Sequence, residues 1–301
     1  MSEQTADDRT APGLLDGLVR FIPQKWRPGV PVVPVVRLSG VIGAVTPLRP
    51  GMSLAGVARL LERAFATRNA KAVALAINSP GGSPVQSRLI YLRIRQLAAE
   101  KKLPVLAFVE DVAASGGYML ACAADEIYCD PSSILGSIGV VGGTFGFPEL
   151  LKKIGVERRL YIAGEHKAQL DPFLPEDPAD VARIKALQRE IHALFISLVK
   201  DSRGARLKAN EDVLFSGEYW AGKTSVEMGL ADEIGELRSV LRARFGDKVR
   251  TPVIAQPSGM LAGLLGRKSG AGVSAMDGVS GLPDALVSAL EARAIWAKYG
   301  F

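Results

Sequence analysis

Apolar residues occur along this chain in two patterns that alternate. The first pattern is a short, continuous run rich in Val, Ile and Ala, which recurs at residues 31–43, 71–78, 104–110 and 126–130. Such runs, bounded by Gly, Pro or polar residues, are typical of strands buried on both faces of a sheet. The second pattern has helical spacing, and it recurs at residues 53–67, 84–100 and 114–124. The alternation predicts an α/β domain whose central sheet is largely parallel and flanked by helices.

Several helix starts are marked by capping residues. Ser53 precedes the first helical segment, and Ser83-Pro84 precedes the second, with Gln86 at the capping-box position. Asp177-Pro178 predicts the start of a long helix that ends near Arg203, with one continuous apolar face. We also expect a short helix near residues 148–154, a strand at 158–164 and a smaller unit over 211–245.

Both ends of the chain differ from its middle. Residues 1–29 predict a flexible or peripheral segment, residues 30–250 one main domain, and residues 251–301 a Gly-rich linker followed by an amphipathic helix. The start lacks a signal-peptide pattern, and no run reaches the roughly 18–20 apolar residues of a membrane span. We therefore expect a cytoplasmic protein. Residues 14–26 are apolar with interspersed basic residues, so a peripheral membrane contact is an alternative to a docking role.

Composition excludes several classes of function. The net charge of +6 comes from basic residues scattered among acidic ones, so we expect no nucleic-acid partner. With only two Cys and two His, the chain predicts neither a disulfide framework nor a catalytic metal site. Cys122 lies in an Ala-rich stretch and is interpreted as a small buried apolar residue.

Candidate chemistry begins where the predicted strands end. Asn78-Ser79-Pro80-Gly81-Gly82 joins a strand to a helix through two glycines, which allow a close approach to the backbone. Backbone N–H groups near a helix N-terminus stabilise negative charge, as an oxyanion hole requires. A plain turn is the alternative interpretation of this segment alone.

A serine stands in a second Gly-rich turn, Ala113-Ala114-Ser115-Gly116-Gly117. The small neighbours of Ser115 leave its hydroxyl accessible, and both turns are expected at the same edge of the sheet, where α/β proteins bind ligands. Ser115 is therefore a candidate nucleophile, and helix capping is the alternative role.

A serine nucleophile needs a base to accept its proton. The residues themselves offer His166 and the adjacent Lys167, which position alone does not separate, whereas His192 is expected to be structural inside the long helix. A lysine acts as a base near neutrality only when desolvation lowers its pKa from about 10.4. The apolar residues that follow Lys167 are candidate walls: Leu170, Pro172, Phe173 and Leu174.

Five ordered blocks resemble the signal peptide peptidase A family, the Ser–Lys peptidases of peptidase family S49, in its short single-repeat form. The resemblance spans about residues 32–245. Its blocks are NSPGG at 78–82, ASGGY at 114–118, GSIGV at 136–140, the His-Lys loop at 166–167 followed by DPF, and GLADEIG at 229–235.

The resemblance implies a crotonase/Clp-like fold and a serine endopeptidase without a cofactor or metal. Ser115 would be the nucleophile, Lys167 rather than His166 the base, and the N–H groups of Gly82 and Gly116 the oxyanion hole. The substrate groove would be an edge strand formed by Gly136, Ser137, Ile138, Gly139 and Val140. The resemblance further implies hydrophobic peptides as substrates, notably signal-peptide remnants. It also implies a homo-oligomer in which Ser and Lys of one site come from adjacent protomers.

Other functions remain open at this level. A crotonase-type acyl-CoA enzyme would use the same two N–H groups but would need a carboxylate base and a CoA-binding surface. A Clp-type protease would need a Ser-His-Asp triad with its histidine nearer the serine in sequence. A non-catalytic oligomeric scaffold would use the terminal helices as its working surfaces.

Overall fold

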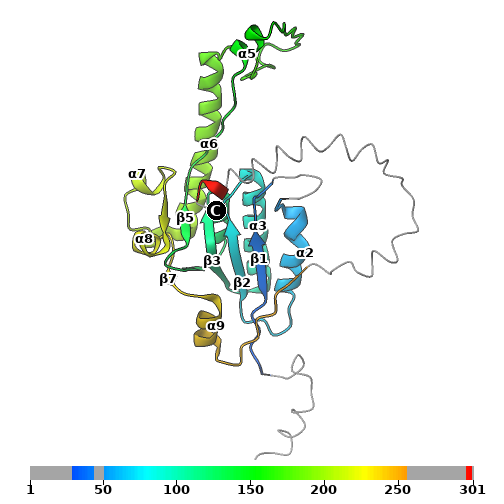
Figure 1. Ribbon diagram of the computed structural model, residues 1–301. Helices are drawn as coiled ribbons and strands as arrows, with labels where there is room; N and C mark the ends of the chain where they lie inside the picture. The colour runs from blue at the N-terminus through cyan, green and yellow to red at the C-terminus, as the bar shows by residue number, and fades with distance from the viewer. Residues whose placement is uncertain (1–28, 44–50, 256–295, 300–301) are drawn as a thin grey trace, which may run out of the picture.

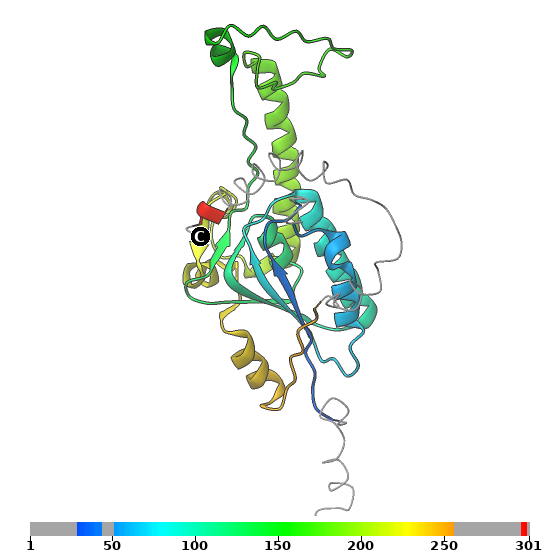
Figure 2. The ribbon, with the colours of Figure 1, turned by 45° about the vertical axis from the view of Figure 1, so that its right-hand side comes forward.

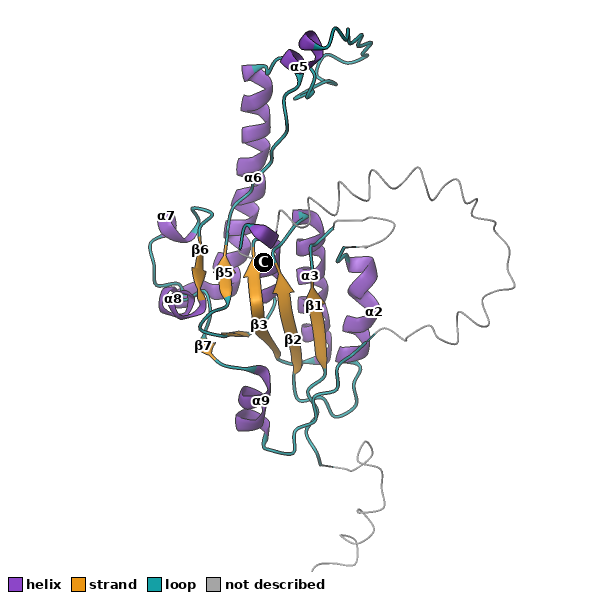
Figure 3. Cartoon of the chain, viewed as in Figure 1, coloured by secondary structure: helices purple, strands orange, loops and turns teal. Residues whose placement is uncertain are grey.

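The computed structural model describes residues 29–43, 51–255 and 296–299. Its centre is a sheet in which five parallel strands follow the order β1-β2-β3-β4-β7 (Figures 1 and 3). Their bounds are Val35–Ser39, Val73–Ser79, Val105–Ala114, Glu126–Cys129 and Glu233–Ile234. Two short strands, β5 (Ile134–Gly136) and β6 (Tyr219–Ala221), extend the sheet beside the far end of β3, and β6 runs antiparallel to β5.

Helices cover both faces of the sheet. The larger buried cluster contains side chains of α2 (Leu54–Phe65), α3 (Pro84–Lys101) and α4 (Gly116–Ala121). On the opposite face, α9 (Leu237–Phe245) packs through Leu241 onto a smaller cluster. The strands are buried on both sides because helices cover both faces, which explains their continuous apolar runs. The α/β architecture expected from the sequence is confirmed.

The predicted caps and helix bounds are confirmed closely. The Ser53 side chain accepts a hydrogen bond from the N–H of Gly56, and Ser83 accepts one from the N–H of Gln86. Asp177 caps α6 (Pro178–Arg203), and α5 spans Pro148–Lys153. The remaining helices are short: η2 (Gly204–Arg206), α7 (Glu211–Leu214) and α8 (Gly222–Met228).

The strand expected at residues 158–164 is wrong. In the structure this segment is an exposed loop, and no described strand lies beside it to supply backbone partners. The predicted helix at the end of the chain and the segment 14–26 fall largely outside the described residues. Only residues 296–299 of that helix are described, and residues 296 and 297 are helical.

Residues 141–187 form an arm that projects from the rest of the chain, which we call the body (Figure 2). The arm contains α5 at its outer end and returns along α6 (Figure 1). Many large apolar side chains of the arm are exposed, including Val141, Phe145 and Tyr161. The apolar face predicted for α6 is buried only near its end, at Phe195, Leu198 and Val199.

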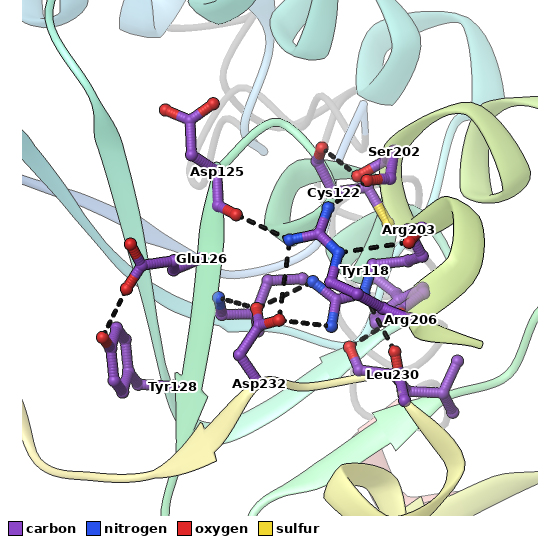
Figure 4. A network of polar contacts seen from close by, with 12 residues as sticks. Tyr118, Cys122, Asp125, Glu126, Tyr128, Ser202, Arg203, Arg206, Leu230 and Asp232 are labelled. Carbon is purple, nitrogen blue, oxygen red and sulfur yellow. Dashed lines mark hydrogen bonds and ion pairs between the residues drawn. The ribbon is translucent and has the colours of Figure 1, made fainter. Parts of the chain in front are cut away.

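A buried ion pair anchors the end of α6 in the body (Figure 4). The guanidinium of Arg203, whose side chain is 0% exposed, donates two hydrogen bonds to Asp232 at 2.8 and 2.9 Å. Asp232 also accepts the N–H of Ile127 in β4. Burial raises the pKa of Asp232, but the hydrogen bonds from Arg203 and Ile127 outweigh this effect, so the pKa lies below its ordinary value.

In the described part of the chain, no helix has both the length and the apolar character needed to cross a membrane.

Candidate active site

The two Gly-rich turns meet at the same edge of the sheet. β2 and β3 are neighbours, and Ser79 at the end of β2 pairs with Ala113 near the end of β3. A Cβ atom added to Gly81 would lie 2.8 Å from both the nitrogen of Gly116 and the Cβ of Ser115. The turns therefore touch, and their contact requires a glycine at position 81.

Ser115 has an unusual backbone conformation, with φ +52° and ψ −122°. Its N–H donates to the carbonyl of Gly136 in β5 at 2.8 Å, and its own carbonyl accepts the N–H of Tyr118 in α4. Its hydroxyl makes no capping hydrogen bond with α4, so the capping interpretation is wrong. A positive φ on a non-glycine residue costs about 1–3 kcal/mol and is concentrated at functional sites.

Two backbone donors flank Ser115. Gly116 begins α4, where an N–H group has no intrahelical acceptor, and Gly82 lines the same cavity as Ser115. Within the described residues, neither of these two N–H groups has a hydrogen-bond acceptor. Gly82 has φ +139°, and a Cβ atom there would lie 2.1 Å from the carbonyl oxygen of Ile42. Any other residue would therefore displace this turn.

The segment 136–140 only partly matches its prediction. Gly136 ends β5, but residues 137–140 are not a strand, and β5 is not an edge because it lies between β3 and β6. The positive φ angles of Gly136 and Ser137, +107° and +52°, end the strand. Ser137, Gly139 and Val140 nevertheless line the cavity of about 570 Å³ that Ser115 also lines.

Lys167 and His166 lie away from Ser115. Both are exposed in the loop between α5 and α6, at the outer end of the arm. His192 of α6 lines the cavity of Ser115, and Pro178, where α6 begins, is 14 residues earlier. At 1.5 Å per residue this is about 20 Å of helix, so one chain does not bring Ser115 and Lys167 together.

Two basic side chains that line the cavity of Ser115, His192 and Lys298, were not predicted from the sequence to lie there. His192 was expected only as a structural residue, and its Nε2 lies 2.9 Å from the carbonyl oxygen of Ile138. Because a carbonyl only accepts, Nε2 carries the proton and holds the segment 137–140 in place. Lys298 lines the cavity from the end of the chain. Nothing in the spacing of these residues from Ser115 could have indicated their position.

The cysteines offer no competing nucleophile. Burial raises the pKa of the Cys122 thiol to about 11, and burial also raises that of Cys129 to about 11. Both thiols are therefore protonated and inert near neutrality. Among the described residues, no group of three or more His, Cys, Asp or Glu side chains could hold a metal ion.

Comparison with known proteins identifies a family. The pattern of "Peptidase family S49" matches residues 97–247, which is half of the chain. The relative "Serine protease SPPA, chloroplastic" of Arabidopsis thaliana is 31% identical over 258 residues, which cover 80% of this chain and 38% of that protein. "Probable protease SohB" of Buchnera aphidicola (subspecies Acyrthosiphon pisum) is 36% identical over 173 residues, 58% of this chain and 50% of that protein.

One relative that is more similar to this chain than these two is named as an antiporter rather than as a protease. The "Na(+)/H(+) antiporter NhaA" of Brucella abortus is 55% identical over 296 residues, 96% of this chain but only 39% of that longer protein. The chain therefore spans about two fifths of that relative. Among solved structures, a 1510-N membrane-bound stomatin-specific protease in complex with a substrate peptide matches 79% of this chain and 98% of its own, at 15% identity and a TM-score of 0.49.

Proposed function

The chain belongs to peptidase family S49, and on this premise we propose that it is a serine endopeptidase with Ser115 as nucleophile. The observation that carries the proposal is the contact between the two turns. Gly81 packs against the nitrogen of Gly116 and against Ser115, whose backbone has a positive φ, and Gly82 lines the same cavity as Ser115. An oxyanion requires two such backbone donors, whereas a plain turn or a helix cap requires neither the strain nor the second turn.

The proposed reaction follows acyl transfer. A neutral amine accepts the proton of the Ser115 hydroxyl while Oγ attacks the carbonyl carbon of the scissile peptide bond. The N–H groups of Gly82 and Gly116 hold the oxygen that becomes negatively charged. Collapse of this intermediate breaks the C–N bond, and the leaving amine takes the proton from the base. Water then attacks the acyl-enzyme ester and releases Ser115.

We assign the amine to Lys167 of an adjacent protomer, because within one chain Lys167 lies on the arm, away from Ser115. The exposed apolar side chains of the arm favour burial against a second copy of the chain. Such burial would disfavour the charged form of a lysine, as a general base requires. A head-to-tail interface closes into a ring when the rotation between neighbouring protomers closes, and a ring is the assembly we propose. Hydrophobic peptides, including signal-peptide remnants, are the substrates we propose.

Mixing two inactive variants tests this shared site. Ser115→Ala and Lys167→Ala chains, each inactive alone, are co-expressed so that they assemble together. If Ser and Lys come from neighbouring chains, about a quarter of the sites in a random mixture combine an intact Ser115 with an intact Lys167. Hydrolysis of a hydrophobic peptide should therefore return to about that fraction. No recovery in verified mixed oligomers would contradict a site shared between chains.

The identity of the base needs its own comparison. Lys167→Ala is expected to abolish hydrolysis, whereas His166→Ala, His192→Ala and Lys298→Ala should retain a base. Loss of activity in Lys298→Ala or His192→Ala with full activity in Lys167→Ala would move the base to the cavity of a single chain. The His192 variant also separates positioning from proton transfer, because loss of the Ile138 contact should raise KM more than it lowers kcat.

A serine-reactive fluorophosphonate probe tests the nucleophile directly. We expect labelling of Ser115 and none in Ser115→Ala. A crotonase-type acyl-CoA enzyme or a silent scaffold would leave Ser115 unlabelled, and that result would refute the peptidase proposal.

A further inference from the structure

The last described residues of the chain, 296–299, lie against the body beside β5 and β6 (Figures 1 and 2). Lys298 and Tyr299 line the same cavity as Ser115. The segment arrives from far along the sequence, yet its tyrosine is 7% exposed and belongs to a buried cluster.

Tyr299 occupies a slot whose walls come from three strands. Its side chain clusters with Val112 and Ala114 of β3, and Ile134 of β5 packs against the same cluster. The ring of Tyr219 in β6 meets that of Tyr299 edge-on, with 5.0 Å between the ring centroids. The slot is therefore apolar and shaped for an aromatic ring.

Polar groups at the slot bind both the side chain and the backbone of its occupant. Burial raises the pKa of Tyr299, and a polar interaction with the Ser137 side chain opposes this shift. The hydroxyl of Tyr219 donates to the backbone carbonyl of Lys298 at 3.2 Å. A few polar groups in an apolar pocket are the usual features of a ligand site, because they fix the orientation of what binds.

The position of the slot relates it to the nucleophile. Ala114 directly precedes Ser115, and Ser137 directly follows Gly136, whose carbonyl accepts the N–H of Ser115. Strands β3, β5 and β6 form these walls through their own pairing, which does not involve residues 296–299. The slot is thus part of the body, and Tyr299 is an occupant that reaches it from another part of the chain.

We propose that this slot is a subsite for an aromatic side chain of a bound peptide, and that Tyr299 is its occupant within the chain. The C-terminal segment and a peptide then compete for one place beside Ser115. That such a peptide is also a substrate rests on the proposed peptidase function, whereas its binding does not.

Binding is measured on the full chain carrying Ser115→Ala, so that no peptide is cleaved. The probes are two fluorescent hydrophobic pentapeptides, identical except for Tyr or Ala at the central position, and their affinities are compared by anisotropy. Occupancy of the slot by Tyr299 lowers apparent affinity by the fraction of free slots. Tyr299→Ala should therefore tighten binding of the Tyr peptide about 10-fold or more and change that of the Ala peptide far less.

Three further variants make the result specific. Tyr299→Phe retains the ring and should leave the slot mostly occupied, so affinities should rise by no more than about 2- to 10-fold over the parent. Tyr219→Ala, combined with Tyr299→Ala, should remove the preference for the Tyr peptide. Ser137→Ala in the same background should make Tyr and Phe peptides bind equally, where the intact slot favours Tyr by about 2- to 10-fold.

The outcomes separate this proposal from the proposed function. Equal affinity of the Tyr and Ala peptides for Tyr299→Ala overturns the subsite, even if the parent enzyme cleaves peptides. Selective binding of the Tyr peptide to Tyr299→Ala supports the subsite, even if Ser115 proves unreactive toward the fluorophosphonate probe.

Discussion

The body and the arm carry the two halves of the proposed catalytic apparatus in opposite states. Around Ser115, the turn, the two candidate backbone donors and the cavity all lie within one chain. Around Lys167, the loop is exposed, and many large apolar side chains of the arm are exposed as well. In our proposal, one half of the site is completed by the folding of the chain itself, and the other half requires a partner.

This difference suggests how the proposed peptidase activity could be controlled. A nucleophile held in a strained turn is ready as soon as the body folds, but proton transfer requires the base. If the base comes from a neighbour, assembly becomes the step that switches on the activity, and isolated chains stay inactive. The following predictions test the contrast between a self-contained body and an arm that depends on a partner.

Removing the ion pair that anchors α6 in the body should change stability more than any substitution in the arm. Asp232→Ala leaves the buried Arg203 guanidinium and the N–H of Ile127 without their partner. The free energy of unfolding should fall by about 3–5 kcal/mol, measured by urea denaturation. The control is Glu157→Ala in the arm, which breaks an ion pair with Arg159 whose side chains are 73% and 70% exposed. It should change the free energy of unfolding by less than about 1 kcal/mol. Similar losses in both variants would contradict the contrast.

Glycine substitutions give the next effect, on activity. Gly82→Ala forces a Cβ atom against the carbonyl of Ile42 and displaces a proposed oxyanion donor, so kcat should fall about 10²–10³-fold. Gly155→Ala in the arm also introduces a side chain at positive φ, +72°, but nothing lies within 4 Å of that Cβ position. Steady-state kinetics should show kcat for Gly155→Ala within a few-fold of the parent. An equal loss would show that strain alone, rather than the oxyanion hole, explains the effect of Gly82→Ala.

Apolar side chains of the arm should affect assembly more than folding. Phe145 is 79% exposed, so Phe145→Ser should leave the unfolding free energy of the chain within about 0.5 kcal/mol. Loss of its burial between protomers should weaken association about 10-fold or more, measured by analytical ultracentrifugation. Val253→Ser, a similar change on the body at 59% exposure, is the control and should leave association unchanged. Equal assembly of both variants and the parent would argue against the arm as an interface.

The smallest effect is a pH dependence of stability in the body. Since the pKa of Asp232 is lowered in the folded chain, its contribution is fully present above the ordinary carboxyl value of 3.8 and is lost as pH falls through the lowered value. The stability difference between the parent and Asp232→Asn should therefore shrink on acidification below about pH 4. Urea denaturation at several pH values measures it, and a difference independent of pH would contradict the assigned ionisation of Asp232.

Local patterns predicted most of the body and part of the arm. The apolar runs located β1 to β4, and the caps at Ser53, Ser83 and Asp177 located three helix starts. These features are predictable because a cap or a buried strand leaves its pattern within a few residues. The prediction of a strand at 158–164 was wrong because an apolar run forms a strand only beside another strand, and a local pattern does not show whether one is near.

The candidate site was predicted in the same uneven way. Ser115, Gly82 and Gly116 stand out because positive φ angles and close backbone contacts demand small residues locally. His192, Lys298 and Tyr299 were not predicted as cavity residues, because no local pattern marks a side chain that reaches a site across the fold.

Local sequence patterns were enough to predict the α/β class, the two Gly-rich turns and the residue types that could perform acyl transfer. Each of these depends on periodicity or on backbone conformations that few residues can adopt. Tertiary packing was needed to show that the turns touch, that β6 pairs with β5, that Tyr299 fills a slot beside Ser115 and that Lys167 lies on the arm. These placements follow from how long segments pack against one another, and packing over such distances leaves no periodic trace in the chain.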